Sequence, residues 1–247
     1  MRQRNRLITM YWLLVMALFG GAMYLVAFRT PDEASTGPIQ KIFYLHIPVA
    51  TSTLLGCLVV FIASAGYLWQ RTSGWDDLSA SAAKVTVVLC SVVLLTGMIW
   101  GRGAWGRWWT WNPRLTFSLM LWLLYVGYLL IRNSIDSAQR RAVVAAVYGI
   151  IAFLDVPLVY LSACMMPESH PSPVELDPAM QRALVAMFIP VTLAALGLIV
   201  MRYLVARDER ARAELAHRSI DESSPEDMTA SLDSMLRPAA RLEASRD

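Results

Sequence analysis

Six long runs of apolar residues constrain the fold of this chain more than any other feature of its sequence. A helix needs about 20 apolar residues to cross the hydrocarbon core of a bilayer. Runs close to that length lie at residues 7–28, 43–70, 78–100, 115–131, 142–166 and 183–201. The sequence is 56% hydrophobic and only 17% charged, which is typical of membrane proteins. We therefore expect an all-α, polytopic membrane protein, a bundle of six transmembrane helices.

The positions of the arginines predict how these helices are oriented. Three arginines lie within the first six residues, and others follow the second, fourth and sixth runs. Because positive residues gather in cytoplasmic loops, we expect both termini in the cytoplasm of a bacterial cell and the helices in its inner membrane. The outward loops are then residues 29–42, 101–114 and 167–182. The first run is expected to remain as a span, since it is longer than a typical signal-peptide core and no small-residue cleavage site follows it.

The composition changes near residue 207. Residues 1–206 hold the six apolar runs, whereas residues 207–247 are rich in charged residues, Ser, Pro and Ala. We expect a membrane domain followed by a cytoplasmic tail that packs poorly. One short amphipathic helix is predicted in this tail, with Ser224 as its N-cap and Leu236 on its apolar face. That helix either docks on a partner or frays.

Several chemical signatures are missing from the sequence. Cys57, Cys90 and Cys164 are isolated, and no C-x-x-C-H haem-attachment motif is present, so the chain is not itself a c-type cytochrome. We expect Cys57 and Cys90 to be buried apolar residues. No P-loop glycine pattern is found, which excludes ATP hydrolysis by that mechanism. The net charge of +3 comes largely from arginines at helix ends, so no nucleic-acid partner is predicted.

The segment at residues 100–114 carries five tryptophans together with Arg102, Arg107 and Arg114. An interfacial aromatic belt normally places only one or two Trp or Tyr at each helix end. A dense set of indoles suits a flat, hydrophobic ligand on which the rings can stack, and arginines suit carboxylates at its edge. Haem has both features. Because positive charge is disfavoured in an outward loop, we expect the three arginines to face an anion.

Two histidines are predicted at the same membrane face as this segment. His46 lies at the outward start of the second run, with Pro48 expected in the first turn of that helix, and His170 lies between the fifth and sixth runs. Each histidine alone is more often an ordinary interfacial or loop residue. Together, two imidazoles could ligate iron from opposite sides of a macrocycle held on the indoles. His217, in the tail, lies outside this group.

Asp155 interrupts the fifth run, two residues before Pro157. An acid within a membrane span is a functional candidate, because an unpaired carboxylate there is costly. A protonated or hydrogen-bonded carboxyl, packed between helices beside a proline kink, explains it equally well. We assign it no catalytic role.

These residues resemble those of a known family. The run Trp100–Arg114 resembles the tryptophan-rich WWD motif of haem-handling proteins, and its setting between two spans is similar to that in CcmC, a family of system I cytochrome c maturation. Residues 41–48, around His46, and His170 resemble the two histidine regions of the same family. The resemblance covers about residues 10–205. The family motif ends in Asp, whereas this chain has Asn112.

The resemblance implies a function and a set of site residues. The chain would present a transiently bound haem b at the periplasmic face to a CcmE-like haem chaperone, as a haem-delivery component rather than a conventional enzyme. CcmA-like and CcmB-like ABC transporter subunits and a small CcmD-like subunit would be partners, with membrane lipid around them. His46 and His170 would be the axial iron ligands. The haem platform would be Trp105, Trp108, Trp109 and Trp111, with Asn112 and Arg114 beside it.

Two other functions remain open. One is an enzyme, either a cytochrome c haem lyase of the CcmF or CcsA type or a haem-containing quinol oxidoreductase. Such enzymes use more histidines than the two that lie near the membrane here. The other is a scaffold subunit of an ABC transporter that binds no haem. A haem absorption band that is lost with His46 and His170 would exclude the scaffold.

Overall fold

Helices make up most of the described part of the protein. The computed structural model describes residues 2–34, 36–165 and 177–222, and within them the only β pairing is an isolated bridge between Glu33 and Gly37. In chain order the elements are α1 (Arg2–Tyr24), a π-helical segment (Leu25–Arg29), a 3₁₀ helix (Pro38–Ile42), α2 (Phe43–Gln70), α3 (Ser73–Trp105), α4 (Pro113–Asn133), α5 (Ala138–Phe153), α6 (Asp155–Met165) and α7 (Pro178–Glu222).

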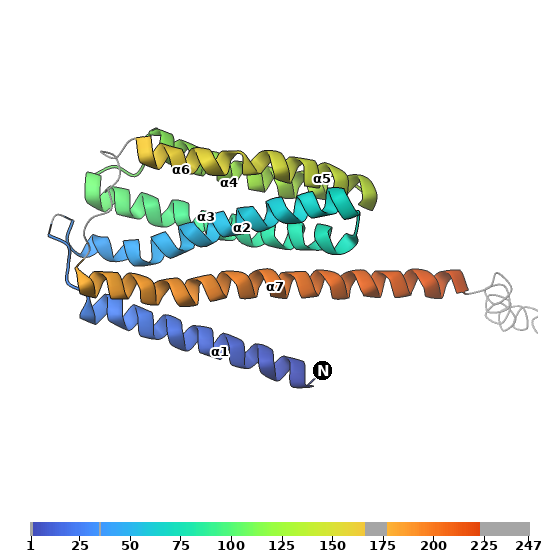
Figure 1. Cartoon of the computed structure of the whole chain (residues 1–247), viewed down its shortest axis with the longest axis horizontal. Coiled ribbons are helices and arrows are strands. Elements are labelled where there is room, and N and C mark those ends of the chain that lie inside the picture. Colours follow the sequence, from blue (N-terminus) through green and yellow to red (C-terminus); the bar gives the residue numbers. More distant parts are fainter. Residues whose placement is uncertain (1, 35, 166–176, 223–247) are drawn as a thin grey trace, which may run out of the picture. The chain divides into compact units, whose positions relative to one another are not determined.

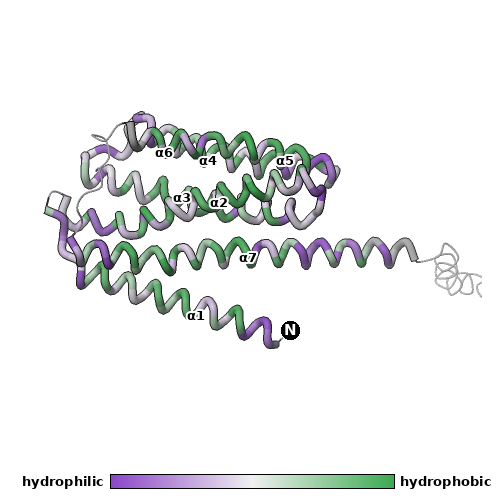
Figure 2. Tube along the Cα trace, in the orientation of Figure 1, coloured by the Kyte–Doolittle hydropathy of each residue, from purple (hydrophilic) through white to green (hydrophobic). Residues whose placement is uncertain are grey.

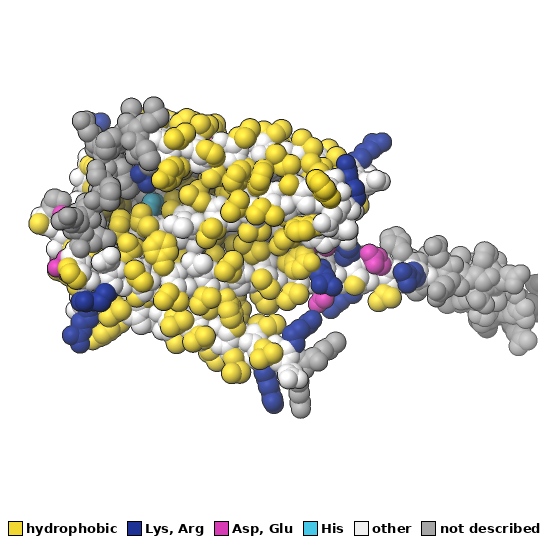
Figure 3. Space-filling view, in the orientation of Figure 1, with side chains coloured by type: hydrophobic (Ala, Val, Ile, Leu, Met, Phe, Trp, Pro, Cys, Tyr) yellow, Lys and Arg dark blue, Asp and Glu magenta, His cyan; other side chains and the backbone are white. Residues whose placement is uncertain are grey.

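Six helical stretches are long and apolar enough to cross a membrane, which confirms the predicted number of spans. Figure 2 shows apolar residues along the middle of the helices and hydrophilic residues toward their ends. In the space-filling view, apolar side chains cover the sides of the helices, and Lys and Arg gather near the ends (Figure 3). The six stretches are Gln3–Arg29, Pro38–Gln70, Ser73–Trp105, Pro113–Asn133, Ala138–Ser162 and Pro178–Ala216.

The chain divides into two units, Met1–Tyr203 and Leu204–Asp247. In the first unit, α1, α3 and α6 finish at one end of the bundle, and α2, α4 and α7 begin there (Figure 1). We call this the loop end, because residues 30–34 and 106–112 lie there. The described part of the second unit continues α7 to Glu222, with mostly exposed side chains.

The tail is therefore more helical near its start than expected. Residues 204–216 are rich in Arg, Glu, Ala and Leu, which are strong helix formers even where no packing supports them. The short helix predicted from Ser224 lies outside the described residues.

The core of the first unit is built around α2. This helix packs most closely against α3 and next against α5. Small side chains at these interfaces let transmembrane backbones approach one another. The cysteines predicted to be buried, Cys57 and Cys90, are both in this core. Its main buried cluster includes Cys57, Val60, Ala82, Ala83, Cys90, Leu121, Tyr125, Tyr128, Ala145 and Ala152.

A buried polar network joins α2, α3 and α4 at the opposite end of the bundle. Asp76, in the first turn of α3, pairs with Arg132, in the last turn of α4, through N–O distances of 2.5 and 3.0 Å. The Ser79 hydroxyl lies 2.7 Å from the Tyr128 hydroxyl and 3.1 Å from that of Ser64. Both charges also suit the dipoles of their own helices. Arg132 is therefore a helix–helix contact as well as a topology signal.

The fifth span consists of two helices. The helix α5 ends at Phe153 and α6 begins at Asp155. Pro157 has no N–H to bond to the Phe153 carbonyl, which explains the break. Asp155 is only 3% exposed, and neither carboxylate oxygen has a hydrogen-bond partner among the described residues. The Asp155 carboxyl group is thus buried beside a proline break, as expected for a carboxyl packed between helices. It has no hydrogen bond within the described part of the chain.

Two helix boundaries at the loop end differ from those expected. The helix α3 continues to Trp105, so the start of the predicted loop at residues 100–114 is helical, and the connection spans residues 106–112. Gly106 ends α3 in the left-handed region, with φ of 73°, a conformation that glycine adopts at little cost. The expected position of Pro48 is wrong. The 3₁₀ helix runs directly into α2, so Pro48 lies inside α2 and not in its first turn.

Candidate functional site

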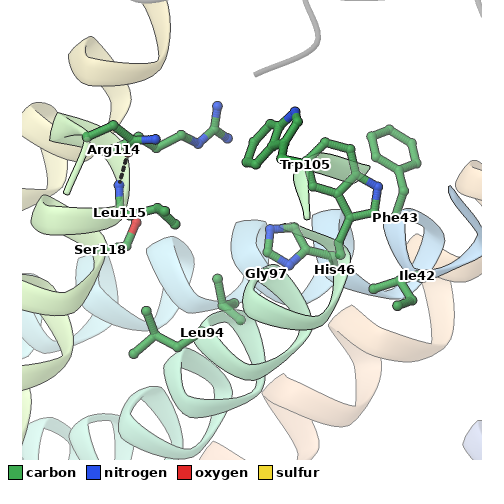
Figure 4. A pocket seen from close by; sticks show the side chains of 12 residues that line it. Ile42, Phe43, His46, Leu94, Gly97, Trp105, Arg114, Leu115 and Ser118 are labelled. Carbon is green, nitrogen blue, oxygen red and sulfur yellow. Dashed lines mark hydrogen bonds between the residues drawn. The ribbon is translucent and has the colours of Figure 1, made fainter. Parts of the chain in front are cut away.

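A cavity lies at the loop end of the bundle, between α2, α3 and α4 (Figure 4). Its empty volume, open mouth included, is about 730 Å³. Cofactor and small-molecule sites are mostly apolar, with a few polar groups that orient the ligand. This cavity fits that description. Its lining residues are Ile42, Phe43, His46, Val93, Leu94, Gly97, Trp100, Trp105, Asn112, Arg114, Leu115 and Ser118.

His46 enters the cavity wall from α2. Its Nδ1 atom lies 2.8 Å from the hydroxyl oxygen of Thr96 on α3. The next residue of α3, Gly97, also borders the ring, because a Cβ atom there would stand 3.4 Å from His46 Cε1. Figure 4 shows His46 and Gly97 side by side at the cavity. Two consecutive residues of α3 therefore hold one edge of this imidazole.

Two tryptophans at the end of α3 supply the indoles of the cavity. The rings of Trp100 and Trp105 meet edge to face, with centroids 4.8 Å apart, which is a favoured aromatic geometry. Gly103, between them, receives Ile39 of the 3₁₀ helix, and a Cβ atom at Gly103 would lie 2.5 Å from Ile39. This close approach packs the segment that precedes His46 against the end of α3.

The start of α4 supplies the polar side of the cavity. Asn112 is the N-cap of α4, since its side-chain oxygen accepts a hydrogen bond from the Leu115 N–H at 2.9 Å, and Pro113 follows at the first helical position. Arg114 lies in the first turn and lines the cavity. The dipole of a helix disfavours a cation at this position. A guanidinium group beside a helix N-terminus makes this wall positive and suits an anion.

The three arginines at residues 102–114 have different surroundings. Arg102 donates a hydrogen bond to the Gly106 carbonyl at the C-terminal end of α3, where the helix dipole favours a cation. Arg107 is exposed and lies outside the cavity lining. Of the three arginines, Arg114 alone lines the cavity, and the expectation that they face an anion stays a prediction.

Three of the predicted platform tryptophans do not line this cavity. Trp108 and Trp111 are 56% and 76% exposed. Trp109 meets Trp111 edge to face at 5.7 Å, and its indole N–H is buried with no hydrogen-bond partner in the described part of the chain. The role of these three residues in a platform stays a prediction. His170 lies outside the described residues, so its proximity to His46 also stays a prediction.

The part of α3 that precedes Trp100 was not predicted to belong to the site. Leu94 and Gly97 share one face of α3 with Trp105, which was predicted as a platform residue, but they lie before the expected loop. The continuation of the helix to Trp105 is what joins them. The contact of Thr96 with His46 could not be predicted from the sequence, because the two residues are 50 positions apart.

Comparison with known proteins identifies the family. A profile of the CcmC family, described as Heme exporter protein C, matches residues 1–225. Heme exporter protein C of Bradyrhizobium diazoefficiens is 34% identical over 132 residues, which are 53% of this chain and 50% of that protein. The protein of the same name from Paracoccus denitrificans is 35% identical over 115 residues, 47% of this chain and 48% of that protein. Heme exporter protein C of Escherichia coli (strain K12) is 29% identical over 190 residues, which are 74% of this chain and 77% of that protein.

The extent of these matches differs. The chain spans about half the length of the Bradyrhizobium and Paracoccus relatives and about three quarters of the Escherichia coli relative. The profile, in contrast, covers nearly the whole chain, including all six spans. The chain therefore belongs to the CcmC family, Heme exporter protein C.

Proposed function

We propose that this chain binds haem at the loop end of its bundle and offers it to a haem chaperone during the maturation of c-type cytochromes. The family description, Heme exporter protein C, supports haem as the ligand. The structural observation that carries the proposal is one cavity lined by an imidazole, two indoles and a guanidinium group. These groups match the needs of haem: a nitrogen ligand for iron, aromatic faces for the ring and a cation for the propionates.

His46 is the proposed iron ligand from within the cavity. An imidazole nitrogen is a common axial ligand of haem iron. His170 is proposed as the second ligand on the strength of the family resemblance. The segment that carries it joins the end of α6 to the start of α7, and both of these lie at the loop end (Figure 1).

The other site residues have separate proposed tasks. Trp100 and Trp105 would contact the porphyrin within the cavity, and Arg114 would pair with a propionate. Trp108 and Trp111, which expose much of their surface, would extend this platform toward the delivery partner. Asn112 would hold the start of α4, and with it Arg114, in place through its capping hydrogen bond.

The proposal places the loop end at the periplasmic face of the inner membrane, as the distribution of positive charge favours. A CcmE-like chaperone would receive the haem there. CcmA-like and CcmB-like transporter subunits and a CcmD-like subunit are proposed as the other partners. The chain would act by binding and release, as a haem-delivery component and not as an enzyme.

Haem spectra of the purified protein test ligation. We expect His46→Ala and His170→Ala each to change the spectrum and weaken haem binding, because loss of one imidazole leaves iron five-coordinate or bound to a substitute. His217→Ala is the control and should behave as the native protein. Native spectra in both of the first two variants would refute the ligand assignment. A native protein that acquires no haem band would refute haem binding altogether, and failure to load an apo CcmE-like chaperone would refute delivery.

A further inference from the structure

We infer that Thr96 fixes the tautomer of His46 and thereby selects Nε2 as the nitrogen that ligates iron. The inference deepens the proposed function and rests on its assignment of His46 as a haem ligand. Thr96 itself does not touch the proposed ligand, so it is a positioning residue that acts through the imidazole.

The contacts of the Thr96 hydroxyl determine where its proton lies. The hydroxyl oxygen is 2.7 Å from the Val92 carbonyl oxygen and 3.2 Å from that of Val93, both in the preceding turn of α3. A carbonyl oxygen can only accept a hydrogen bond, so a contact of 2.7 Å requires the hydroxyl proton to lie toward Val92. A hydroxyl has only this one proton to donate. The Thr96 oxygen is therefore an acceptor in its 2.8 Å contact with His46 Nδ1.

The proton in the contact with Thr96 must then belong to the imidazole of His46. A neutral imidazole carries one proton, so protonation of Nδ1 leaves the lone pair on Nε2. Only the nitrogen that holds a lone pair can ligate a metal. Metal-bound histidines usually donate their other N–H to an oxygen atom, which fixes the ring and makes it a stronger donor to the metal. The hydrogen bond to Thr96 therefore leaves the Nε2 lone pair available for iron and also fixes the orientation of the ring.

The position of Thr96 in the fold makes this arrangement rigid. His46 and Thr96 lie on α2 and α3, the two helices that pack most closely in the unit. Gly97, the residue after Thr96, borders the Cε1 edge of the ring, where a Cβ atom would lie at an ordinary contact distance of 3.4 Å. The imidazole is thus oriented by the helical core of the bundle, so we expect the ligand to be preorganised before haem arrives.

Variants of Thr96 in the full-length, haem-loaded protein test this inference. Thr96→Val keeps the shape of the side chain but removes the acceptor. We expect about 10- to 100-fold weaker haem binding, measured as transfer to apomyoglobin. We also expect a more positive reduction potential, because a less basic imidazole stabilises ferric iron less. Thr96→Ser should restore both properties toward native values. Thr51→Val is the matched control: the Thr51 hydroxyl makes the same type of bond to the Ile47 carbonyl at 3.0 Å but lies on an exposed face of α2.

A second measurement leaves Thr96 intact. In His46→Gly, added imidazole should restore the native haem spectrum at lower concentration than N-methylimidazole, because the methylated ring has no N–H to donate to Thr96. The difference should disappear in the double variant His46→Gly/Thr96→Val. Equal rescue by the two compounds in His46→Gly would overturn the inference, whatever the folding of the Thr96 variants.

The outcomes separate this inference from the proposed function. A native spectrum in His46→Ala would refute ligation by His46, and the inference would fall with it. Loss of haem in His46→Ala, with native affinity and potential in Thr96→Val, would refute the role of Thr96 alone. Thr96→Ser as impaired as Thr96→Val, or Thr51→Val as impaired as either, would show that packing or the helix bond matters instead of the imidazole contact.

Discussion

Neighbouring residues at the start of α4 differ in whether they stabilise the helix. Asn112 forms the capping hydrogen bond to the Leu115 N–H, and Pro113 is suited to the first helical position. Arg114, one residue later, opposes the dipole of the same helix. The helix dipole therefore does not explain its placement in the cavity wall, and the proposed function assigns it to an anionic group of the ligand.

A pairing between Arg114 and a haem propionate predicts a selective loss. Arg114→Gln should weaken binding of haem by about tenfold or more, because a hydrogen bond to a charged group contributes about 1.5–3 kcal/mol. Haem dimethyl ester, which has no free propionate, should bind the variant and the native protein almost equally. Titration of both ligands into both proteins, followed by absorbance, measures the difference. An equal loss for acid and ester would assign Arg114 to the structure of the cavity alone.

Asn112 stands where the resembling motif has Asp, and its capping role predicts that either residue supports the fold. Asn112→Asp keeps an acceptor for the Leu115 N–H and adds a negative charge near a helix N-terminus, so the unfolding temperature should stay the same or rise. Asn112→Ala should destabilise the protein by about 1 kcal/mol. Thermal unfolding in detergent measures both. A marked loss of stability in Asn112→Asp would contradict this account, and faster haem transfer with unchanged binding would show that the carboxylate serves delivery.

At the scale of the helices, one glycine and two prolines decide where the elements begin and end, because glycine can adopt a left-handed backbone and proline lacks an N–H donor. Gly106 ends α3, Pro113 begins α4 and Pro157 divides α5 from α6. The first of these boundaries matters most for the site. Because α3 reaches Trp105, the indoles of Trp100 and Trp105 are carried on a helix that is packed against α2, and not on a loop.

The contact between Asp76 and Arg132 predicts strong coupling between α3 and α4. The two side chains are 7% and 12% exposed. Arg132→Met should lower the free energy of unfolding by about 3–5 kcal/mol, since it leaves a buried carboxylate without its partner. The double variant Asp76→Leu/Arg132→Met should recover most of that loss, because both charges of the pair are then removed together. A double variant as unstable as the single one, by thermal unfolding in detergent, would show that packing and not the lone charge is responsible.

At the scale of the whole molecule, six spans put the connections of the chain alternately on two sides of a membrane. The helices α2, α4 and α7 all begin at one end of the first unit (Figure 1). The cavity belongs to that end. The proposed function requires this end to face the periplasm.

Reporter fusions test directly which side of the membrane the loop end faces. With a cytoplasmic N-terminus, fusions at residues 35, 107 and 173 should report the periplasm, and fusions at residues 74, 136 and 220 should report the cytoplasm. Alkaline phosphatase and green fluorescent protein fusions give opposite signals for the two compartments. A cytoplasmic signal at residue 107 would place the cavity on the inner side and would contradict delivery to a periplasmic chaperone.

The number of spans and the chemical types of residue at the cavity could be predicted from the amino-acid sequence alone. Run length and apolar composition suffice for the spans, because a helix in lipid satisfies its own backbone and needs no particular neighbour. His46, Trp105, Asn112 and Arg114 were also identified from sequence, and all four line the cavity.

The positions of these residues relative to the cavity could not be predicted without the packing of the helices. The structure shows that Arg102 bonds the end of α3 while Arg114 lines the cavity, and that Trp108 and Trp111 lie outside its lining. It also brought Thr96 to His46 across 50 residues of sequence. Such pairings depend on which faces of two helices pack together. Hydrophobic runs that are apolar on every side, as in these spans, do not specify those faces.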